Sequence, residues 1–393
     1  MKPKRSPLLP AALSLFFCLM LSQLSFGATQ SVTELQNSYS GTTNWNAASH
    51  TLTFTTSGTI NFNKPDYKSY FWDVPQEVST IIINANVTVT GAFHTYYNCT
   101  VRGMNRSTSI IFGDNEQRWA LNRDLEPWKY CQFENLGGVL TVENLTVLNP
   151  FAYCIRGWGT VCHTRNCDYI DNRGGWYNHS DGIMGGHGST IDNCYFELGD
   201  DVLKCYFDMT ITNVTINMIQ NSVPFALGWN NYQDSNIKAS NITIFGTWGR
   251  AQVRPIFQWK AGADLRTILI DGLYVDNPTA TLFDLVGEGS LNLEIKNAQI
   301  NVKTYGTSSF PRVRRICGTE TQSNTYNCAE NYSPADYDQD DDVDFVDFQV
   351  LVTSWLKQPG DPNYDSRANL DNDPLGHVDF RDYAIFAEYW AGE

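Results

Sequence analysis

Three aspartates in two nearby segments have the residue type that acid–base chemistry needs. Asp181 lies in HSDGI (179–183), and Asp200 and Asp201 lie together in LGDDVLK (198–204). Clustered carboxylates raise each other's pKa, so such a group can present a protonated acid beside an ionised base. Glycoside hydrolysis requires that combination at the scissile bond. An isolated Asp-Asp pair would instead predict a solvated turn, so the interpretation depends on a fold that brings Asp181 beside the pair.

Short strand-like segments along the middle of the chain predict such a fold. They alternate polar with apolar residues, are rich in Val, Ile, Thr and Tyr, and recur about every 25 residues. Without helices between them, they predict an all-β chain in which the coils of a parallel β-helix stack on one another. A β-sandwich or propeller is the alternative, but a sandwich would show hairpin turns such as Asn-Gly at intervals of about 8 to 12 residues. Each segment opens at an expected turn residue, namely Asn98, Asn144, Asn166, Asn193, Asn213, Asn241, Gly272 and Asn297.

One coil of this helix would place Asp181 above the Asp200–Asp201 pair. The offsets of 19 and 20 residues are close to the local coil length, so the three carboxylates would share one wall. We therefore predict that Asp181, Asp200 and Asp201 are catalytic. Lys204 could bind a sugar hydroxyl or tune an aspartate, and a solvated lysine is the alternative.

The stretch from Asp181 to Trp229 resembles the dextranase and isopullulanase group, glycoside hydrolase family 49, and more distantly the polygalacturonases. The similarity rests on SDGI, GDDVLKCYFDMTITNVTI and NSVPFALGWN, and it is diffuse over 75–310. The resemblance implies a right-handed, pectin-lyase-like parallel β-helix that inverts the anomeric centre. It also implies that Asp200 is the general acid, while Asp181 and Asp201 hold and deprotonate the water.

The sequence departs from these families in ways that bear on the substrate. The large N-terminal β-sandwich of the family is not evident, and the polygalacturonase Gly-His-Gly and Arg-Ile-Lys signatures do not follow the aspartate pair. Gly186-His187-Gly188 precedes the pair, and we interpret His187 as a turn residue. The missing basic residues favour a neutral glucan over anionic polygalacturonate.

Aromatic residues near the three aspartates are candidates for sugar binding. Flat aromatic faces can cover the apolar faces of sugars, although aromatic rings also fill cores. Trp229 falls inside the family-like stretch, and Trp176 precedes Asp181 by five residues in a Gly-rich loop. We predict that Lys204, Trp229 and Trp176 bind substrate.

The C-terminal tail carries most of the acidic charge and predicts calcium binding. Residues 334–393 hold 13 Asp and 2 Glu against three basic residues, a net charge of −12 out of −15. Acids at positions 1, 3, 5, 9 and 12 of a twelve-residue loop have the spacing that surrounds calcium, and the pattern returns 35 residues later. A disordered tail is the alternative, but apolar residues at helical spacing follow each loop. The predicted ligands are Asp336, Asp338, Asp340, Asp344, Asp347, Asp371, Asp373, Asp379 and Asp382.

This duplicated loop and helix resembles a type I dockerin, whose loops end in Asp. The resemblance implies structural calcium and a cohesin-bearing scaffold protein as partner. Asp341 stands where the first loop usually has Gly, and Leu375 leaves the second loop one carboxylate short. We expect weaker calcium binding in the second loop and no cofactor in catalysis.

The first 27 residues predict a secretory signal peptide. Basic residues precede an apolar run, and small residues surround the expected cleavage near Gly27. A membrane anchor is the alternative, but polar residues interrupt the run. We expect a secreted product without a membrane span after cleavage, which could be held at the cell surface through the dockerin.

Nine cysteines remain beyond the leader. Cys317 and Cys328 are close in sequence, and we expect a local disulfide between them. The settings of Cys99, Cys131, Cys167 and Cys194 favour stacked, unbridged core positions.

Together these patterns predict a polysaccharide hydrolase acting on a dextran- or pullulan-like glucan. Nucleic acid is excluded as a partner because the chain lacks clustered positive charge. The alternatives are a polygalacturonase or pectate-type lyase on the same fold, and a noncatalytic β-helix for carbohydrate binding or adhesion. The predicted parts are the signal peptide (1–27), a β lead-in (28–75), the catalytic β-helix (76–312), a linker (313–333) and the dockerin (334–393).

Overall fold

The body of the computed structural model is built from three columns of parallel strands. The structure describes residues 30–64, 69–113, 130–173, 180–246, 254–286, 289–308 and 314–318 of the body, and residues 335, 337, 343, 345–365, 368–370 and 377–390 of the tail. The predicted signal peptide, Trp176, the Cys317–Cys328 disulfide and six predicted calcium ligands lie outside the described residues and side chains: Asp336, Asp338, Asp340, Asp344, Asp371 and Asp373.

The first column, which we call sheet A, contains the strands that carry the predicted aspartates. Each strand pairs in parallel with the strand one coil away. Its members are β4 (Phe71–Asp73), β7 (Ala92–Thr95), β10 (Cys131–Asn135), β13 (Tyr153–Arg156), β16 (Asp181–Met184), β19 (Asp201–Lys204), β21 (Val223–Trp229), β23 (Pro255–Ala261) and the C-terminal parts of β24 (Leu265–Leu285) and β25 (Ser290–Ser308).

The other two columns, sheets B and C, follow sheet A within each coil. Sheet B holds β2 (Thr51–Phe54), β5 (Thr80–Ile83), β8 (Cys99–Gly103), β11 (Val139–Glu143), β14 (Val161–Arg165), β17 (Ser189–Asp192), the first parts of β20 (Met209–Asn217), β22 (Ser235–Phe245), β24 and β25, and β26 (Arg314–Gly318). Sheet C holds β3 (Gly58–Thr59), β6 (Val87–Thr90), β9 (Ser109–Phe112), β12 (Thr146–Leu148), β15 (Asp168–Ile170), β18 (Tyr195–Glu197) and later parts of β20, β22, β24 and β25.

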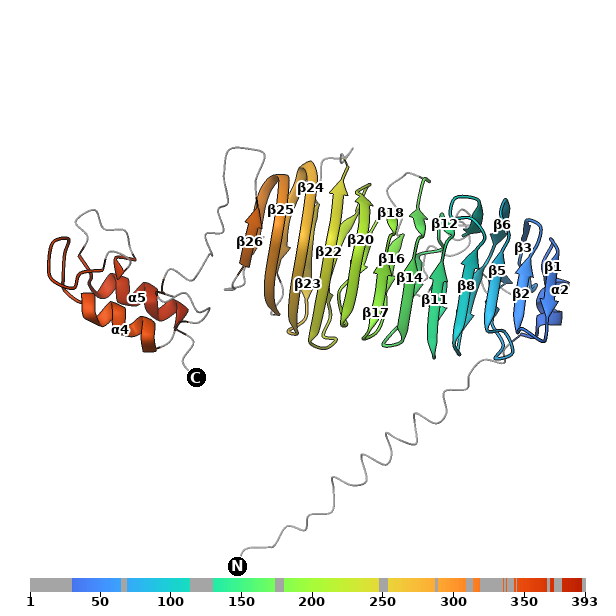
Figure 1. Ribbon diagram of the computed structural model, residues 1–393, viewed down its shortest axis with the longest axis horizontal. Coiled ribbons are helices and arrows are strands. Elements are labelled where there is room, and N and C mark those ends of the chain that lie inside the picture. The colour runs from blue at the N-terminus through green and yellow to red at the C-terminus, as the bar shows by residue number, and fades with distance from the viewer. Residues whose placement is uncertain are drawn as a thin grey trace, which may run out of the picture.

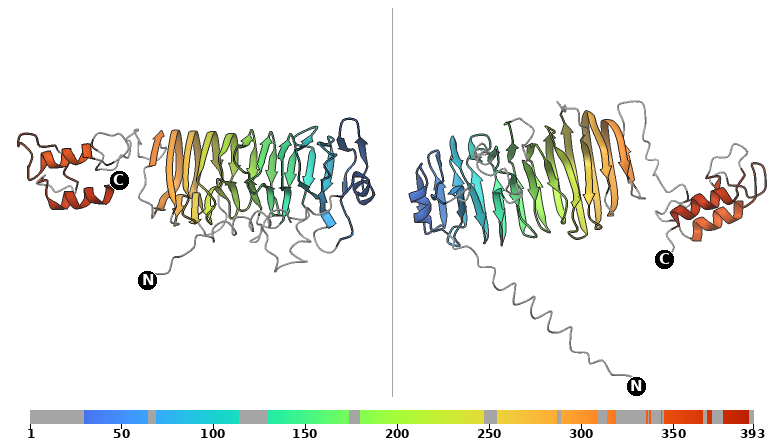
Figure 2. Two further views of the ribbon diagram at one scale, coloured as in Figure 1. Left: turned by 90° about the horizontal axis from the view of Figure 1, so that it is seen from below. Right: turned by 180° about the vertical axis from the view of Figure 1, so that it is seen from behind.

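Strands of successive coils therefore lie side by side along the body (Figures 1 and 2). This arrangement confirms the prediction of an all-β chain with stacked parallel strands, a parallel β-helix. The stack extends past the predicted limits of 76 and 312, because β2 already pairs with β5 and β26 still pairs with β25. The sequence did not show these coils because neither β2 nor β26 opens with the recurring Asn.

An asparagine ladder stabilises the turn between sheets B and C. Asn144, Asn166, Asn193, Asn213, Asn241 and Asn297 all have positive φ, between 50° and 55°. Asn tolerates this left-handed conformation, and its side chain can bond to the coil above or below. The Nδ2 of Asn166 donates to the Oδ1 of Asn144 at 2.6 Å, and the Nδ2 of Asn193 donates to the Oδ1 of Asn166 at 3.1 Å.

The assignment of Asn98 to this ladder was wrong. Asn98 precedes β8 in sheet B, and the residue that corresponds to Asn144 one coil earlier is Gly103, since Glu143 pairs with Arg102. An Asn before a short β-branched segment therefore occurs at two different corners of the coil. The residues on either side of such an Asn do not distinguish the two corners.

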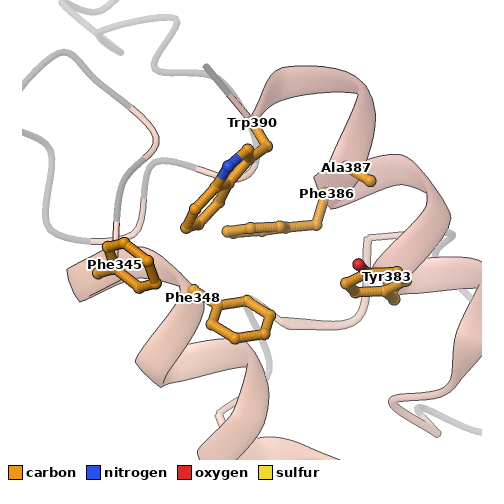
Figure 3. Close-up of a pocket in the computed structure, with 6 residues that line it drawn as sticks. All are labelled: Phe345, Phe348, Tyr383, Phe386, Ala387 and Trp390. Carbon is orange, nitrogen blue, oxygen red and sulfur yellow. The ribbon is translucent and has the colours of Figure 1, made fainter. Parts of the chain in front are cut away.

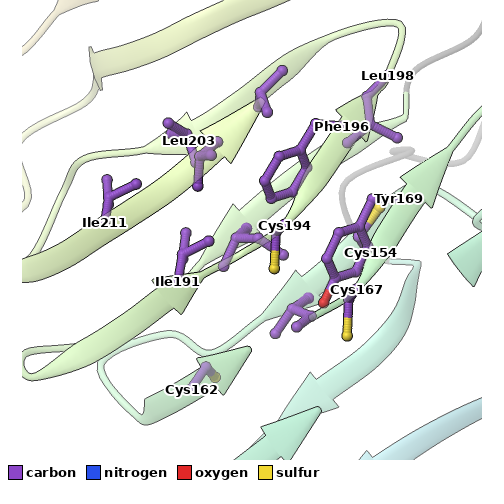
Figure 4. Close-up of a cluster of buried hydrophobic side chains, with 14 of the residues drawn as sticks. Cys154, Cys162, Cys167, Tyr169, Ile191, Cys194, Phe196, Leu198, Leu203 and Ile211 are labelled. Atoms are coloured by element: carbon purple, nitrogen blue, oxygen red, sulfur yellow. The ribbon is translucent and has the colours of Figure 1, made fainter. Parts of the chain in front are cut away.

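The core fills the inside of the coils, and six of the seven described free cysteines are among its residues. The seventh, Cys131, lies in a second buried cluster with Tyr153 and Tyr206. Figure 4 shows Cys167 and Cys194 near the rings of Tyr169 and Phe196, which stack with centroids 5.0 Å apart. Cys167 and Cys194 occupy equivalent positions of successive coils because the strands that follow them pair in register. Buried, unbridged thiols are thus confirmed for Cys99, Cys131, Cys167 and Cys194, although Cys99 and Cys131 lie in different sheets.

Helix α2 (Val32–Ser38) covers the N-terminal end of the body (Figure 1). A capping box between Ser31 and Glu34 fixes its start. Val32 and Leu35 are buried in the main core, so α2 closes an end that a stack of coils would otherwise expose. The hairpin of β1 (Thr43–Asn46) with β2 follows it.

The described tail residues contain two helices, α4 (Phe345–Ser354) and α5 (Phe380–Tyr389). They enclose a small cluster of their own that includes Tyr337, Leu351 and Phe386. No helix in the described parts of the chain is long and apolar enough to cross a membrane.

Candidate active site

The start of β19 breaks the usual alternation of a strand and thereby places two charged side chains together. Val202 and Leu203 are consecutive, yet both belong to the main core, whereas successive side chains of a regular strand point to opposite faces. Asp201 and Lys204 on either side of them meet outside that core, with Nζ 2.7 Å from Oδ2. The acid and the amine three residues apart therefore form one pair.

Gly182 brings Asp181 against this pair. A Cβ on Gly182 would lie 2.1 Å from the carbonyl oxygen of Val202, so any larger residue would force β16 away from β19. The register joins Ile183 to Leu203, which aligns Asp181 with Asp201 two residues earlier. The predicted one-coil relation between Asp181 and the aspartate pair is confirmed.

Lys204 lies at the centre of the carboxylates. Its Nζ is 2.8 Å from the Oδ1 of Asp181 and 2.7 Å from the Oδ2 of Asp201, and the residue is 4% exposed. The rings of Tyr153 and Tyr206 lie 5.1 and 5.9 Å from the same Nζ. Burial lowers the pKa of Lys204, but the two carboxylates outweigh it and hold that pKa well above its usual value. The alternative of a solvated lysine is wrong.

Burial raises the pKa of the two buried aspartates, Asp181 and Asp201. Burial, helped by the charges of Asp200 and Asp201 and opposed by Lys204, raises the pKa of Asp181 to about 7. Burial also raises the pKa of Asp201, against the opposing effect of Lys204. Asp200 is less buried, and its Oδ1 accepts a hydrogen bond from the Asp201 amide at 3.1 Å. The site thus holds a buried carboxyl, Asp181, that titrates near neutral pH.

One oxygen of each aspartate lies within 4.8 Å of the others, close enough for a metal ion. However, the Lys204 ammonium already contacts two of the three at hydrogen-bond distance. Oδ2 of Asp201 also accepts from the indole Nε1 of Trp229 at 2.8 Å. Its Oδ1 is buried without a hydrogen-bond partner among the described residues, so this oxygen is an acceptor whose desolvation is not offset within the described part of the chain.

The remaining sequence predictions have mixed outcomes. Trp229 lies at the site and is 45% exposed, but its indole N–H also orients Asp201. His187 lies in a turn as predicted and pairs with Asp208 at 2.8 Å. Lys204 contacts the aspartates, which favours tuning over direct contact with a sugar hydroxyl.

Sequence analysis did not identify the tyrosines of the site. Tyr153 stands one coil before Asp181, with which it is in register, and Tyr206 follows Lys204 by two residues. Counting back one coil would have found Tyr153. Arg254 was also missed, and the charges of Asp200 and Asp201 partly offset the lowering of its pKa by burial. A basic residue after the pair thus lies close enough to interact electrostatically with Asp200 and Asp201.

Comparison with known proteins finds that the chain is similar to dextranases. No protein-family model matches the chain. It is 27% identical over 218 residues to a dextranase of Arthrobacter sp. (strain CB-8), covering 51% of this chain and 33% of that protein. It is 31% identical over 108 residues to a dextranase of Arthrobacter globiformis, covering 27% and 17% of the two chains. The chain thus spans a third or less of the length of these relatives. Among solved structures, Dex49A from Penicillium minioluteum matches with a TM-score of 0.47 and 12% identity over 68% of this chain and 52% of that chain.

Proposed function

We propose that this chain is a glycoside hydrolase acting on a neutral, dextran- or pullulan-like glucan. The observation that carries the proposal is the buried carboxylate group bridged by Lys204. The dextranases to which the chain is similar are its second support. The three carboxyl groups outnumber the two cations near them, Lys204 and Arg254, which disfavours an anionic polyuronate.

The geometry suggests a catalytic or positioning role for each residue of the site. Asp200, the least buried of the three, would donate a proton to the leaving oxygen. Asp181 and Asp201 would hold and deprotonate the attacking water, with the buried Oδ1 of Asp201 as its acceptor. Lys204 and Trp229 both bond Oδ2 of Asp201, so they fix the carboxylate plane.

We propose inversion of the anomeric centre, as the family resemblance implies. The nearest oxygens lie within 4.8 Å, whereas carboxyl groups stand about 6.5 to 9.5 Å apart in most inverting sites and about 5 to 5.5 Å apart in retaining ones. The short distance between the oxygens thus predicts retention of the anomeric configuration, whereas the family resemblance predicts inversion. Proton NMR of the first-formed product decides between them, and a product with the configuration of the substrate would exclude inversion.

The central test is a reducing-sugar assay on dextran, pullulan, pectin and xylan. We expect the wild type to cleave dextran or pullulan and Asp200→Asn to lose about 100-fold or more, since general acid catalysis supplies about 10² to 10⁴. Asp208→Asn is the matched control, because Asp208 pairs with His187 outside the site. A variant Asp200→Asn with more than about a tenth of wild-type activity would contradict the acid role, and cleavage of pectin alone would favour the polyuronate alternatives.

We further propose that the tail is a calcium-binding dockerin on a secreted enzyme. Asp347 and Asp382, the twelfth residues of the two loops, are fully buried in the first turns of α4 and α5. Asp347 accepts a hydrogen bond from the amide of Tyr337, and Asp379 caps α5. These buried carboxylates at the loop ends fit the donor set that calcium requires.

An aromatic pocket between α4 and α5 supports a protein partner such as a cohesin (Figure 3). The side chains around it are apolar, and Phe345 at its edge is 76% exposed. Exposed clusters of this kind commonly mark interaction sites. The pocket is lined by Phe345, Phe348, Tyr383, Phe386, Ala387 and Trp390.

A further inference from the structure

A row of aromatic rings leads away from Lys204 along the outer face of the coils. The ring of Tyr206 lies 5.9 Å from the Lys204 ammonium and stacks on Tyr232, with centroids 4.1 Å apart and planes within 5°. Tyr232 in turn contacts Trp158, with centroids 5.5 Å apart. The row ends at Trp158, which is 64% exposed. These rings are in continuous contact from the carboxylate group to solvent.

The loop that carries Tyr232 is held rigidly by the coil that follows. The amide of Tyr232 donates to Oδ2 of Asp264 at 2.8 Å, and the same oxygen accepts from Arg266 at 3.0 Å. Arg266 is fully buried and also donates to the carbonyls of Leu227 and Gln233. Tyr232 and Gln233 are therefore both anchored to the following coil before a ligand arrives, which lowers the entropic cost of binding.

The turn that carries Trp158 packs against the corresponding turn of the next coil. It lies between Gly157 and Gly159, and a Cβ on Gly186 of the next coil would meet the Gly159 carbonyl carbon at 2.3 Å. The two turns therefore pack backbone against backbone. β13 and β21 are three coils apart in sheet A, about 14 Å at the spacing of neighbouring strands. The rings of Trp158 and Tyr232 meet across the two intervening coils, and the first of these coils has no side chains at Gly185 and Gly186.

We propose that Trp158 and Tyr232 form a subsite that binds a glucosyl ring of the polysaccharide beside the catalytic carboxylates. This inference rests on the proposed function. An exposed indole on a fixed tyrosine presents a flat apolar face, which complements the apolar face of a pyranose ring. Tyr206 is buried and forms the base on which Tyr232 stacks, so the exposed Trp158 is the end of the row that a polysaccharide chain would contact. Isolated exposed aromatics need no explanation, but this one is joined to the site by a row of ring contacts.

The experiment compares Trp158→Ala with wild type on dextran or pullulan and on their oligosaccharides of increasing length. We expect KM for the polymer to rise about tenfold or more with kcat within about twofold, as for truncation of an aromatic anchor. The loss should disappear for oligosaccharides too short to reach the subsite. Trp158→Phe should restore part of the affinity. Tyr274→Ala is the control, because Tyr274 is a similarly exposed aromatic (40%) in sheet C, and its KM should not change.

Binding to the inactive Asp200→Asn protein, measured by calorimetry with the same oligosaccharides, provides a second readout. If Trp158→Ala keeps wild-type KM and wild-type affinity while the enzyme cleaves glucan, the subsite is overturned and the proposed function stands. If the wild type neither binds nor cleaves dextran or pullulan, both fail. Should Trp158→Ala lower the melting temperature, Trp158→Phe carries the same comparison: weaker binding of long chains supports the subsite, and unchanged binding of all lengths overturns it.

Discussion

Lys204 determines the electrostatics of the candidate site at the scale of single residues. Removing an ammonium from water costs several kcal/mol, which two carboxylates at 2.7 and 2.8 Å offset. Loss of one member of such a group typically costs about 3 to 5 kcal/mol, because a buried charge is left without its partner. Lys204 therefore stabilises the close approach of Asp181 and Asp201.

The raised pKa of Asp181 predicts the pH dependence of hydrolysis. Its pKa is about 7 because the residue is buried near Asp200 and Asp201. If Asp181 helps to deprotonate the water, it must be ionised, so kcat should fall as pH drops below about 7. A kcat profile between about pH 4 and pH 9 measures this limb, which belongs to the coupled group as a whole.

A kcat profile with the opposite dependence on pH would contradict the proposed role of Asp181 as a base. Activity that stays constant at low pH and is lost above about 7 would make Asp181 the acid. Asp208→Asn again serves as the control, and its profile should overlay that of the wild type.

The sequence predicted which aspartates meet but not how Lys204 joins them. The offset between Asp181 and Asp201 matches one coil, and this relation is visible in the letters. Regular alternation would place Asp201 and Lys204 on opposite faces. They share a face because Val202 and Leu203 both enter the core. The sequence DVLK alone does not predict this break in alternation.

At the scale of strands and turns, the sequence predicted that the coils repeat, but it predicted less well which corner of the coil each Asn occupies. Asparagines at positive φ recur at one corner of the coil, and their spacing revealed the stack. Asn98 shows the limit, because an Asn before a strand occurs at more than one corner. The predicted limits of the stack were too narrow for a related reason. The segments that extend the stack at either end, β2 and β26, do not open with the recurring Asn.

Gly182 offers a test of how closely β16 and β19 must pack. Gly182→Ala would place a methyl group 2.1 Å from the Val202 carbonyl oxygen, so we expect the free energy of unfolding to fall by about 1 to 3 kcal/mol and activity to fall markedly, as for other overpacked positions. Gly159→Ala is the control, since its Cβ meets nothing within 4 Å. With φ of 75°, it should cost about 1 kcal/mol from backbone strain.

Thermal unfolding and glucan hydrolysis of the two variants measure the difference. Equal stability and activity for Gly182→Ala and Gly159→Ala would show that β16 can move away from β19 without cost. The alignment of Asp181 with Asp201 would then not depend on this close approach.

At the scale of the whole molecule, body and tail have separate cores. The main core joins the coils from Val32 to Ile300, and the tail cluster joins residues from Ala335 to Phe386. The acidic charge is as unequally divided, with −12 of −15 in residues 334–393. Conditions that act on acidic loops should therefore affect the tail and leave the body unchanged.

Calcium removal tests this separation in the full-length protein. Without the ion, the loop acids repel one another around the buried Asp347 and Asp382, so we expect a chelator to reduce the helical circular dichroism signal and calcium to restore it. Hydrolysis should survive the chelator, because the Lys204 ammonium already occupies the position between Asp181 and Asp201 that a cation would take. The variant Asp347→Ala should lose the calcium response and keep its activity. If the chelator instead abolished hydrolysis, the three aspartates of the body would have to bind a metal ion, and the lyase alternative would gain support.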